Sequence, residues 1–598
     1  MYQHFNALKP APLKKRLHEL RSILAEQKLN GFLIPRADLY QNEYIEPCDS
    51  RLEWITGFTG SAGLCLVTLQ SAFIFVDGRY KVQVKKEIHS GLFQIILTSD
   101  TSFLSWIQKY CRNQVIGYDP WLHTVSEIDK LASENTSGVK IKKCSNIVDI
   151  IWTQKPRRIS QSLERHPTKF SGTTSKIKRA QIGEIISNNG ADAVILTKPD
   201  SICWLLNIRG KDIAHTPIVQ SLAIVQKNSN TKLFLRDVNI SRQIKRFLGD
   251  FVEVLDQTMF LEQISSMKNQ TVQIDPNSCP VAVLDSLTLP NDNILKLTDP
   301  CIRPKAIKNP IEIKGAKEAH ILDATAFIRF LHWLDTQIDP SELDEISIIK
   351  KLEAFRRQSN LLEEIAFDTI CGSGSNGAIV HYKVNTKTNK KIEKNNLLLI
   401  DSGGQYRMGT TDLTRTIVIG RPKQKMIDAF TYVLKGMIKI SNLNWPIGLS
   451  GQHIDALARA PLWSIGLDYD HGTGHGIGSY LSVHEGPHGI SRRNNFPLEP
   501  GMLVSNEPGY YEVGQFGIRI ENVLLIKKLP KTEQCKNIML AFETLTLVPI
   551  DKKLINVNLL SKIERKWINS YHSDVYKTIS PSLYSDARKW LKTSCSKI

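Results

Sequence analysis

Acidic and histidine residues in unusual contexts gather in the second half of this 598-residue chain. Asp401 ends an apolar run, and Asp412 opens another eleven residues later. The two runs are predicted strands joined by a glycine-containing turn, with one aspartate on each side of that turn. A charged residue at the end of a buried strand is costly unless it is paired or binds a metal. Each aspartate alone is more typical of a turn or cap, but the pair favours a functional interpretation.

The segment HGTGHGIG places His471 and His475 four residues apart. That spacing would put both on one face of a helix, but four glycines in eight residues argue against a helix. We therefore expect a loop or strand whose backbone approaches another part of the chain closely. The segment is not the H-E-x-x-H motif of zinc peptidases, because the second position lacks glutamate. His484, nine residues further on, is by itself more typical of a surface or core histidine.

Two glutamates extend the set. Glu507 follows an apolar strand, and Glu521 lies in the segment FGIRIENVLLI, which we interpret as one strand. Arg519 and Glu521 would share a face of that strand, so a salt bridge between them is the plain alternative to a functional role. The five residues offer four carboxylates and one imidazole: Asp401, Asp412, His475, Glu507 and Glu521.

Such a set has a definite chemistry if its members converge. Four like charges in one place would repel strongly, and two divalent cations would remove the repulsion. Oxygen-rich ligands with a single nitrogen suit ions such as Mn, Co or Zn. Two ions about 3.5–4 Å apart can share a water, lower its pKa and polarise a carbonyl. This is the equipment for amide hydrolysis, but periodicity alone does not prove that the five residues meet.

The elements that must position these residues form the last and largest of three expected units. Polar, proline-containing segments at about 153–175 and 298–311 are predicted linkers. After the second linker, apolar spacing predicts an α+β unit. Its expected helices lie near 313–336, 341–359 and 424–441, and its expected strands lie at 397–401, 413–419 and 519–526.

The first half of the chain contains a weak internal repeat. A helix, a glycine turn and a buried strand are expected at 16–35 and again at 176–197. Trp54 and Trp204 each precede a turn marked by glycine, at Gly57 and Gly210. Two related α/β domains in tandem are the simplest interpretation, and coincidence between two ordinary α/β units is the alternative.

Composition excludes several classes of protein. Apolar residues make up 41% and charged residues 23%, which is typical of globular proteins. The sequence shows neither the roughly 18 consecutive apolar residues of a membrane helix nor an apolar secretory signal at its start. Ten cysteines without a C-x-x-C pair suit reduced thiols in a cytosol. The net charge of +18 raises a nucleic-acid-binding alternative, but dispersed lysines without interleaved aromatics favour a solvated surface.

Several ordered motifs resemble a known family. IDSGGQYRMGTTDLTRT, HGTGHGIG, SVHEGP, SNEPGYY and GIRIENV resemble the pita-bread metallopeptidases, which include methionine aminopeptidase, prolidase and Xaa-Pro aminopeptidase. CDSRLEWITGFTGSAG, VDGRY, WLLNIRGKDIAHTP and FETLTLVPIDKKLI resemble the long, three-domain form, aminopeptidase P. The resemblance spans nearly the whole chain. It implies two tandem creatinase-like α/β domains, 1–156 and 157–305, and a pita-bread catalytic domain with a C-terminal helical extension, 306–598.

The resemblance also implies roles for individual residues. Asp401, Asp412, His475, Glu507 and Glu521 would be the metal ligands, with Asp412 and Glu521 bridging two ions. His381, in GAIVHY, matches a substrate-side histidine that we count with His484 and Glu507 as catalytic. His471 and His484 would contact the peptide. Arg79, in DGRY, matches an arginine that reaches the active site of a neighbouring subunit in some members.

The implied activity is removal of the N-terminal residue from peptides with proline in second position, by a hydroxide that two metals activate. The family implies two Mn(II) ions, with Co or Zn as alternatives, and a homodimer. We expect a cytoplasmic protein with peptide substrates and no nucleic-acid or membrane partner. Two alternatives remain: a prolidase-like dipeptidase that cleaves Xaa-Pro, and a non-catalytic binding protein on the same fold, as in relatives that lack the metals.

Overall fold

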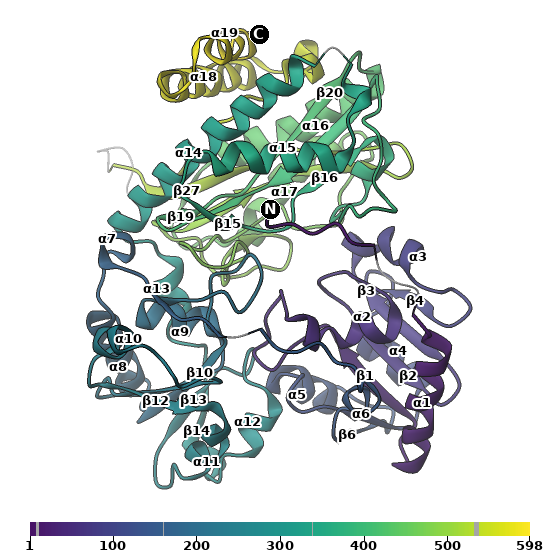
Figure 1. Ribbon diagram of the computed structural model, residues 1–598, viewed down its shortest axis with the longest axis vertical. Coiled ribbons are helices and arrows are strands. Elements are labelled where there is room, and N and C mark those ends of the chain that lie inside the picture. The colour runs from purple at the N-terminus through teal and green to yellow at the C-terminus, as the bar shows by residue number, and fades with distance from the viewer. Residues whose placement is uncertain (8–10, 160, 338, 531–536) are drawn as a thin grey trace. The chain divides into compact units, whose positions relative to one another are not determined.

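The computed structural model describes residues 1–7, 11–159, 161–337, 339–530 and 537–598. The chain divides into two compact units (Figure 1). The N-terminal unit holds residues 9–168 and 173–302, and the C-terminal unit holds residues 1–8, 169–172 and 303–598. Among the described residues, no helix combines the length and the apolar character needed to cross a lipid bilayer.

The N-terminal unit is built from short strands and helices that alternate along the chain. Its strands are β1 (Gly31–Pro35), β2 (Leu64–Thr68), β3 (Ala72–Val76), β4 (Gln94–Leu97), β5 (Val115–Tyr118), β6 (Lys140–Lys143), β7 (Glu164–Arg165), β8 (Ala193–Leu196), β9 (Ile208–Arg209), β10 (Ser221–Gln226), β11 (Thr231–Leu235), β12 (Val252–Asp256), β13 (Val272–Ile274) and β14 (Ile294–Lys296). Its helices are α1 (Leu13–Glu26), α2 (Arg51–Thr56), α3 (Gln83–Glu87), α4 (Phe103–Tyr110), α5 (Val125–Ser133), α6 (Ile147–Ile151), α8 (Ser175–Asn188), α9 (Pro199–Leu206), α10 (Arg242–Leu248), α11 (Phe260–Ser265) and α12 (Val281–Asp285).

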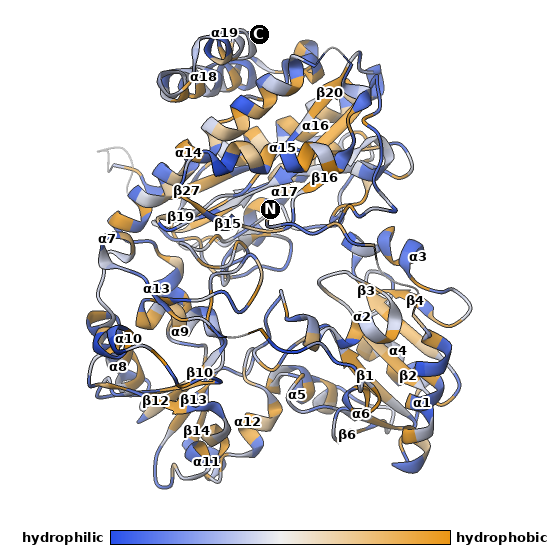
Figure 2. Ribbon diagram, viewed as in Figure 1, coloured by the Kyte–Doolittle hydropathy of each residue, from blue (hydrophilic) through white to orange (hydrophobic). Residues whose placement is uncertain are grey.

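Two six-stranded sheets in this unit have the same topology. One has the order β4-β3-β2-β1-β5-β6 and the other β12-β11-β10-β8-β13-β14. In each, the strand after the first helix is antiparallel to one neighbour and parallel to the other. Figure 2 shows the central strands of these sheets as predominantly apolar, as expected for sheets covered by helices. The internal repeat predicted from the sequence is therefore confirmed.

The turn that we expected at Gly210 lies three residues earlier, at Asn207. In the first copy, Gly57 caps α2 with a φ of +81°, a left-handed conformation that glycine adopts freely. In the second copy the left-handed cap of α9 is Asn207, three residues after Trp204, as Gly57 is after Trp54. Gly210 is required for another reason, since a Cβ there would lie 2.4 Å from the carbonyl oxygen of Ser162.

The C-terminal unit contains longer helices and mixed small sheets. Its helices are α13 (Ile302–Ala306), α14 (Pro310–Asp335), α15 (Glu345–Arg357), α16 (Gln424–Ser441), α17 (Gly451–Trp463), α18 (Lys562–Ile579) and α19 (Ser585–Ser594), with α7 (Thr168–Ser171) at the entry from the N-terminal unit. Its strands are β15 (Leu362–Ile365), β16 (Ile370–Ser373), β17 (Asn396–Ser402), β18 (Gly404–Tyr406), β19 (Gly409–Thr410), β20 (Leu413–Ile419), β21 (Asn444–Pro446), β22 (Gly474–His475), β23 (Gly489–Ile490), β24 (Leu503–Asn506), β25 (Gly509–Glu512), β26 (Phe516–Arg519), β27 (Asn522–Lys528) and β28 (Met539–Thr544).

The predicted helices of this unit are confirmed as α14, α15 and α16. Helix α14 begins where the sequence carries a capping box: the Asn309 side chain accepts from the amide of Glu312, whose carboxylate accepts from the Asn309 amide. The C-terminal helices pack on the same unit, as expected. Trp590 of α19 donates to Asp335 at the end of α14 at 2.9 Å.

Two predictions about this unit were wrong in detail. The connection between β17 and β20 is not a simple turn, because it forms β18 and β19. The single strand expected over FGIRIENVLLI is two strands: β26 pairs with β25, whereas β27 pairs with β24 and β28. Between them the amide of Glu521 donates to the carbonyl of Thr414 at 3.1 Å. The break therefore takes Glu521 out of strand alternation and attaches it to β20.

The two predicted linkers also carry structure. Residues 153–175 include β7, which pairs with β9 inside the N-terminal unit, and α7. Residues 298–311 include α13, whose Lys305 side chain is 3% exposed. Prolines interrupt both segments, as the composition indicated, but their polar side chains find buried partners that composition does not reveal.

Candidate metal centre

The five sequence-predicted ligands all lie at ends of strands in the C-terminal unit. Asp401 is near the end of β17, Asp412 directly precedes β20, and His475 ends β22. Glu507 directly follows β24, and Glu521 lies in the break between β26 and β27. Strands β17 and β20 are antiparallel neighbours, with Asp401 opposite Thr414, so the two aspartates are brought to the same edge of the sheet.

Three of these side chains meet closely. Asp412, His475 and Glu521 each offer a ligand atom, and these atoms lie within 4.8 Å of one another. The His475 Nε2 atom is 3.5 Å from Asp412 Oδ2 and 3.4 Å from Glu507 Oε1. Its Nδ1 is 3.0 Å from the carbonyl of Gly476, which places a proton on Nδ1 and turns Nε2 toward the carboxylates.

Asp401 joins the group through a hydrogen-bonded chain. Arg519 donates from Nη2 to Asp401 Oδ2 at 2.6 Å and from Nε to the Thr414 hydroxyl at 3.2 Å. Thr414 in turn donates to Glu521 Oε2 at 2.8 Å. The salt bridge that we weighed between Arg519 and Glu521 is therefore replaced by one between Arg519 and Asp401. Arg519 and Glu521 are instead connected through the Thr414 hydroxyl, which accepts from the first and donates to the second.

The electrostatics of the group are unfavourable without further cations. Burial raises the pKa of Asp401, and the nearby Arg519 guanidinium opposes that shift. Burial, reinforced by neighbouring carboxylates, also raises the pKa of Glu507 and of Glu521. For His475, burial alone would lower the pKa, but Asp412 and Glu507 outweigh it and raise the pKa to about 9. The protein has thus collected more buried negative charge than its own side chains neutralise.

These residues fit a pair of divalent cations. Asp401 Oδ1 and Glu521 Oε1 are buried without a hydrogen-bond partner, although buried carboxylate oxygens normally have one. Both atoms belong to side chains whose other oxygen is already hydrogen-bonded. Carboxylate oxygens with one imidazole nitrogen are ligands that Mn, Co and Zn accept. A site of this kind requires cations to become electrically balanced.

The glycines around His475 allow the close approach that we predicted. A Cβ on Gly474 would lie 1.8 Å from the carbonyl oxygen of Ser505, and one on Gly476 would lie 2.1 Å from that of Glu485. Neither glycine is needed for a left-handed backbone. Their role is to let the strand that carries His475 pack directly against its neighbours, which confirms the expected strand or loop with close backbone contacts.

Two further predicted histidines lie beside the group. The rings of His475 and His484 are perpendicular, with centroids 4.3 Å apart. His471 is held from both sides: Nδ1 lies 2.7 Å from the Gly472 carbonyl, and Nε2 lies 2.9 Å from the Tyr511 hydroxyl. Tyr511 accepts from Arg519 Nη1 at 2.7 Å, so its own proton points to His471. A hydrogen-bonded chain therefore links His471 to the carboxylate of Asp401.

The structure places the remaining two predicted residues less directly. His381 is half-buried in the C-terminal unit, shortly after a 3-10 turn at Gly374–Ala378. The turn packs on β26, since a Cβ on Gly517 would lie 1.7 Å from the Gly377 carbonyl oxygen. Arg79 lies in the N-terminal unit, where Asp77 accepts from its Nε and Nη2 at 2.9 and 2.8 Å. The roles of both stay predictions.

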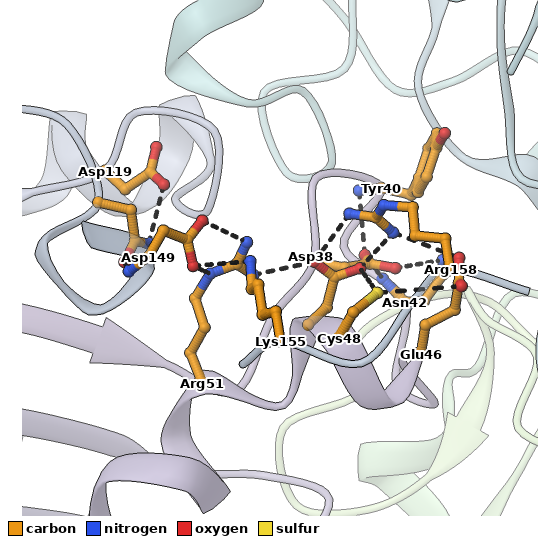
Figure 3. Close-up of polar contacts among 12 residues, drawn as sticks. Asp38, Tyr40, Asn42, Glu46, Cys48, Arg51, Asp119, Asp149, Lys155 and Arg158 are labelled. Atoms are coloured by element: carbon orange, nitrogen blue, oxygen red, sulfur yellow. Dashed lines mark hydrogen bonds and ion pairs between the residues drawn. The ribbon is translucent and has the colours of Figure 1, made fainter. Parts of the chain in front are cut away.

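A second acidic group, in the N-terminal unit, has the opposite character (Figure 3). Glu46, Cys48 and Asp49 also offer ligand atoms within 4.8 Å of one another. Here guanidinium groups supply the positive charge: Arg158 contacts Asp49 at 2.6 Å, and Arg51 contacts the same carboxylate at 3.1 Å. Glu46 is paired with Arg236 at 3.1 Å. This cluster is balanced by the chain itself, so we assign it no metal.

Sequence reasoning missed three residues of the site. Arg519 was considered only as a partner of Glu521, and neither Thr414 nor Tyr511 was singled out. Thr414 and Tyr511 lie within motifs already quoted, TTDLTRT and SNEPGYY. Thr414 lies two residues after Asp412, and Tyr511 lies four residues after Glu507, so proximity to a predicted ligand could have indicated both. Their hydrogen-bond partners are remote in the chain and could not be predicted.

Fold and site together define a metallopeptidase with tandem N-terminal α/β domains. The model of metallopeptidase family M24 matches residues 314–528, and that of the C-terminal region of peptidase M24 matches residues 538–598. Two models of the creatinase/prolidase N-terminal domain match residues 16–151 and 154–312.

Full-length relatives narrow the family. The probable Xaa-Pro aminopeptidase P of Laccaria bicolor is 37% identical over 97% of this chain and 93% of its own length. Xaa-Pro aminopeptidase 1 of Dictyostelium discoideum is 36% identical over 98% and 97%. Among solved structures, the X-prolyl aminopeptidase of Caenorhabditis elegans, a cytosolic enzyme with a di-nuclear active site, superposes with a TM-score of 0.93 at 30% identity, covering 98% of this chain and 100% of that one. The chain belongs to the Xaa-Pro aminopeptidase P family of the M24 metallopeptidases.

Proposed function

We propose that this chain removes the N-terminal residue from peptides that have proline in second position. Its relatives over the full length are Xaa-Pro aminopeptidases, and their names supply the substrate class. The observation that carries the proposal is the buried set of four carboxylates and one imidazole, in which two carboxylate oxygens have no partner. A purely structural cluster would be balanced by arginines, as the cluster of Glu46 and Asp49 is.

Two divalent cations would complete the site. We propose Mn(II) for both, with Co or Zn as substitutes, because the ligands are mostly oxygens. The proposed ligands are Asp401, Asp412, His475, Glu507 and Glu521. When bound, such ions lower the pKa of a water and polarise the scissile carbonyl. Thr414 and Arg519 would hold the carboxylates in place through the hydrogen bonds described above.

Several side chains would handle protons and substrate. Glu507, whose Oε1 accepts from the Ser505 hydroxyl at 3.1 Å, is only part-buried and is placed to take a proton from water and pass it to the leaving nitrogen. His484, beside His475, would donate to the developing oxyanion. An Xaa-Pro amide has no N–H, so the enzyme cannot depend on gripping that group and must recognise the proline ring by shape.

The finer assignments complete the proposal. His381 and His471 would contact the peptide, and Arg79 would reach the active site of a partner subunit in a homodimer. We propose a cytoplasmic location, as for the cytosolic relative from Caenorhabditis elegans. We also propose domain boundaries at 156/157 and 305/306, which rest on the resemblance to the three-domain family described above.

The decisive experiment assays metal-stripped protein on two substrates, the tripeptide Arg-Pro-Pro and the dipeptide Gly-Pro. Mn, Co, Zn and Mg are added back separately, with Asp412→Asn as the inactive control. Release of arginine from the tripeptide, restored best by Mn, is the expected result. Cleavage of Gly-Pro alone would indicate a prolidase, and no cleavage with any metal would indicate a binding protein.

A further inference from the structure

The side chain of the residue that follows His484 is completely buried. The side chain of Glu485 is 0% exposed, and its Oε1 accepts from Lys308 Nζ, which is 1% exposed. A second buried ammonium, that of Lys305, is 3.8 Å from the other carboxylate oxygen. An ion pair so completely removed from water is expensive to form and is weak evidence for stability by itself. Its position next to His484 calls for another explanation.

The lysines belong to a segment that composition marks as a linker. Lys308 follows α13, and it is fixed there by two further bonds. Its Nζ donates to the Lys305 carbonyl at 2.9 Å, and its amide donates to the Gly501 carbonyl at 3.0 Å. The ammonium is therefore anchored independently of Glu485, and the carboxylate is drawn to a fixed point.

The backbone around Glu485 ties that point to the candidate metal ligand His475. The Glu485 amide donates to the Gly476 carbonyl at 2.8 Å, and the same oxygen lies 3.0 Å from His475 Nδ1. The Gly476 amide donates to the His488 carbonyl at 3.1 Å. The loop from 476 to 488 is thus closed at its base by two hydrogen bonds, and His484 is the residue of this loop whose ring faces His475.

We propose that the Glu485–Lys308 ion pair is a positioning device for the His484 imidazole. The buried side chain of Glu485 is held by the ion pair with Lys308. This contact fixes the backbone at residues 484 and 485. The orientation of the His484 imidazole is fixed with it. This inference rests on the proposed function, in which His484 contacts the reacting carbonyl. Supporting residues of this kind change activity by roughly 10–100-fold when they are altered.

The test is a double-mutant cycle on the full-length, metal-loaded protein with an Xaa-Pro-Pro peptide as substrate. Glu485→Gln is expected to lower kcat by roughly 10–100-fold, with KM and the bound-metal content unchanged. In the His484→Ala background the same substitution should lower kcat by less than about 3-fold, because the residue through which it acts is gone. A merely structural role predicts the same loss in both backgrounds.

Lys308→Met is the reciprocal variant and should give the same cycle. If either single variant fails to fold, the triple variant Lys305→Met/Lys308→Met/Glu485→Leu removes all three buried charges and restores folding without restoring kcat. Arg303→Met is the matched control, since Arg303 pairs with Glu499 at the surface of the same segment, and its kcat should be unchanged.

Two outcomes would overturn the inference: an equal loss of kcat with and without His484, or a loss of bound metal in proportion to activity, which would place the effect on His475. Failure of the proposed function is distinguishable, because then the unsubstituted protein would not cleave the peptide at all. That result would end the inference with it.

Discussion

Two buried acidic clusters of this protein contain similar residue types but differ in how their negative charge is balanced. In the N-terminal unit, Glu46 and Asp49 pair with the guanidinium groups of three arginines: Arg51, Arg158 and Arg236. Figure 3 shows Arg158 beside Glu46. In the C-terminal unit, four carboxylates share one arginine, Arg519, which contacts Asp401. Carboxylates in the second cluster have raised pKa values and unpartnered oxygens.

The difference separates acidic groups that stabilise the fold from acidic groups that await a ligand. Both clusters satisfy a purely geometric criterion for a metal site. Only the balance of charge around them distinguishes the two, because a cation adds nothing to a cluster that arginines have already neutralised.

Removing one proposed metal ligand should prevent metal binding in the C-terminal cluster and abolish activity. Asp412→Asn or Glu521→Gln is expected to lower kcat/KM on Xaa-Pro-Pro by about 10³-fold or more, roughly 4 kcal/mol of transition-state stabilisation. Bound metal, measured by atomic emission, should fall in the same variants. Full metal-dependent activity in either variant would contradict the assignment of these two residues.

Metal binding should stabilise the C-terminal unit and should not affect the cluster of Glu46 and Asp49. At a free Mn concentration of about 100 times Kd, the folded protein gains about 2.7 kcal/mol, provided that the unfolded chain does not bind the ion. The thermal midpoint should rise on adding Mn to stripped protein, and Glu521→Gln should remove most of the rise. An equal rise in that variant would locate the metal elsewhere.

The arginine-balanced cluster should respond to loss of its own cation. Arg158→Met leaves the buried Asp49 partly unpaired and is expected to cost about 2 kcal/mol, discounted from the value for a fully buried pair because Arg158 is 37% exposed. Urea unfolding measures the loss. The exposed pair Lys227–Asp192 is the control, and Lys227→Met should change stability by less than about 1 kcal/mol.

Proton release provides the smallest and most specific test. Without metal, His475 has its pKa raised to about 9, so at pH 7 it is protonated and metal must displace that proton. Metal affinity should therefore rise about tenfold per pH unit, or about 1.4 kcal/mol, between pH 7 and 9, and flatten above 9. Isothermal titration in buffers of different ionisation enthalpy measures the released proton.

The raised pKa of His475 also predicts how the stability of the metal-free protein changes with pH. Because the folded protein binds the His475 proton more tightly than the unfolded chain does, this contribution is complete below pH 6.5 and is lost as pH rises through 9. His488 and His572, whose pKa values burial lowers to about 3 and about 4, act only at lower pH. Stripped protein should thus unfold more easily at pH 9 than at pH 7, and metal should reverse the trend.

Prediction from sequence succeeded where information is local. Helix α14 was expected because its apolar residues recur at three- and four-residue spacing in one stretch, and the candidate ligand residues were expected because strand ends and glycines mark them. It failed at Glu521, where one apolar run becomes two strands in different sheets. It also failed in the linkers, where Arg158 and Lys308 reach buried carboxylates far away in the chain.

Residue types and their spacing were enough to predict the kinds of element, the tandem repeat and the residues able to bind divalent cations. Which acidic cluster is short of positive charge depends on contacts between distant parts of the chain. In the folded protein Arg519 pairs with Asp401, Arg158 and Arg236 pair with the cluster of Glu46 and Asp49, and Lys308 pairs with Glu485. The physical reason is that charge is balanced over a few ångströms in space, where residues more than a hundred positions apart in the chain become neighbours.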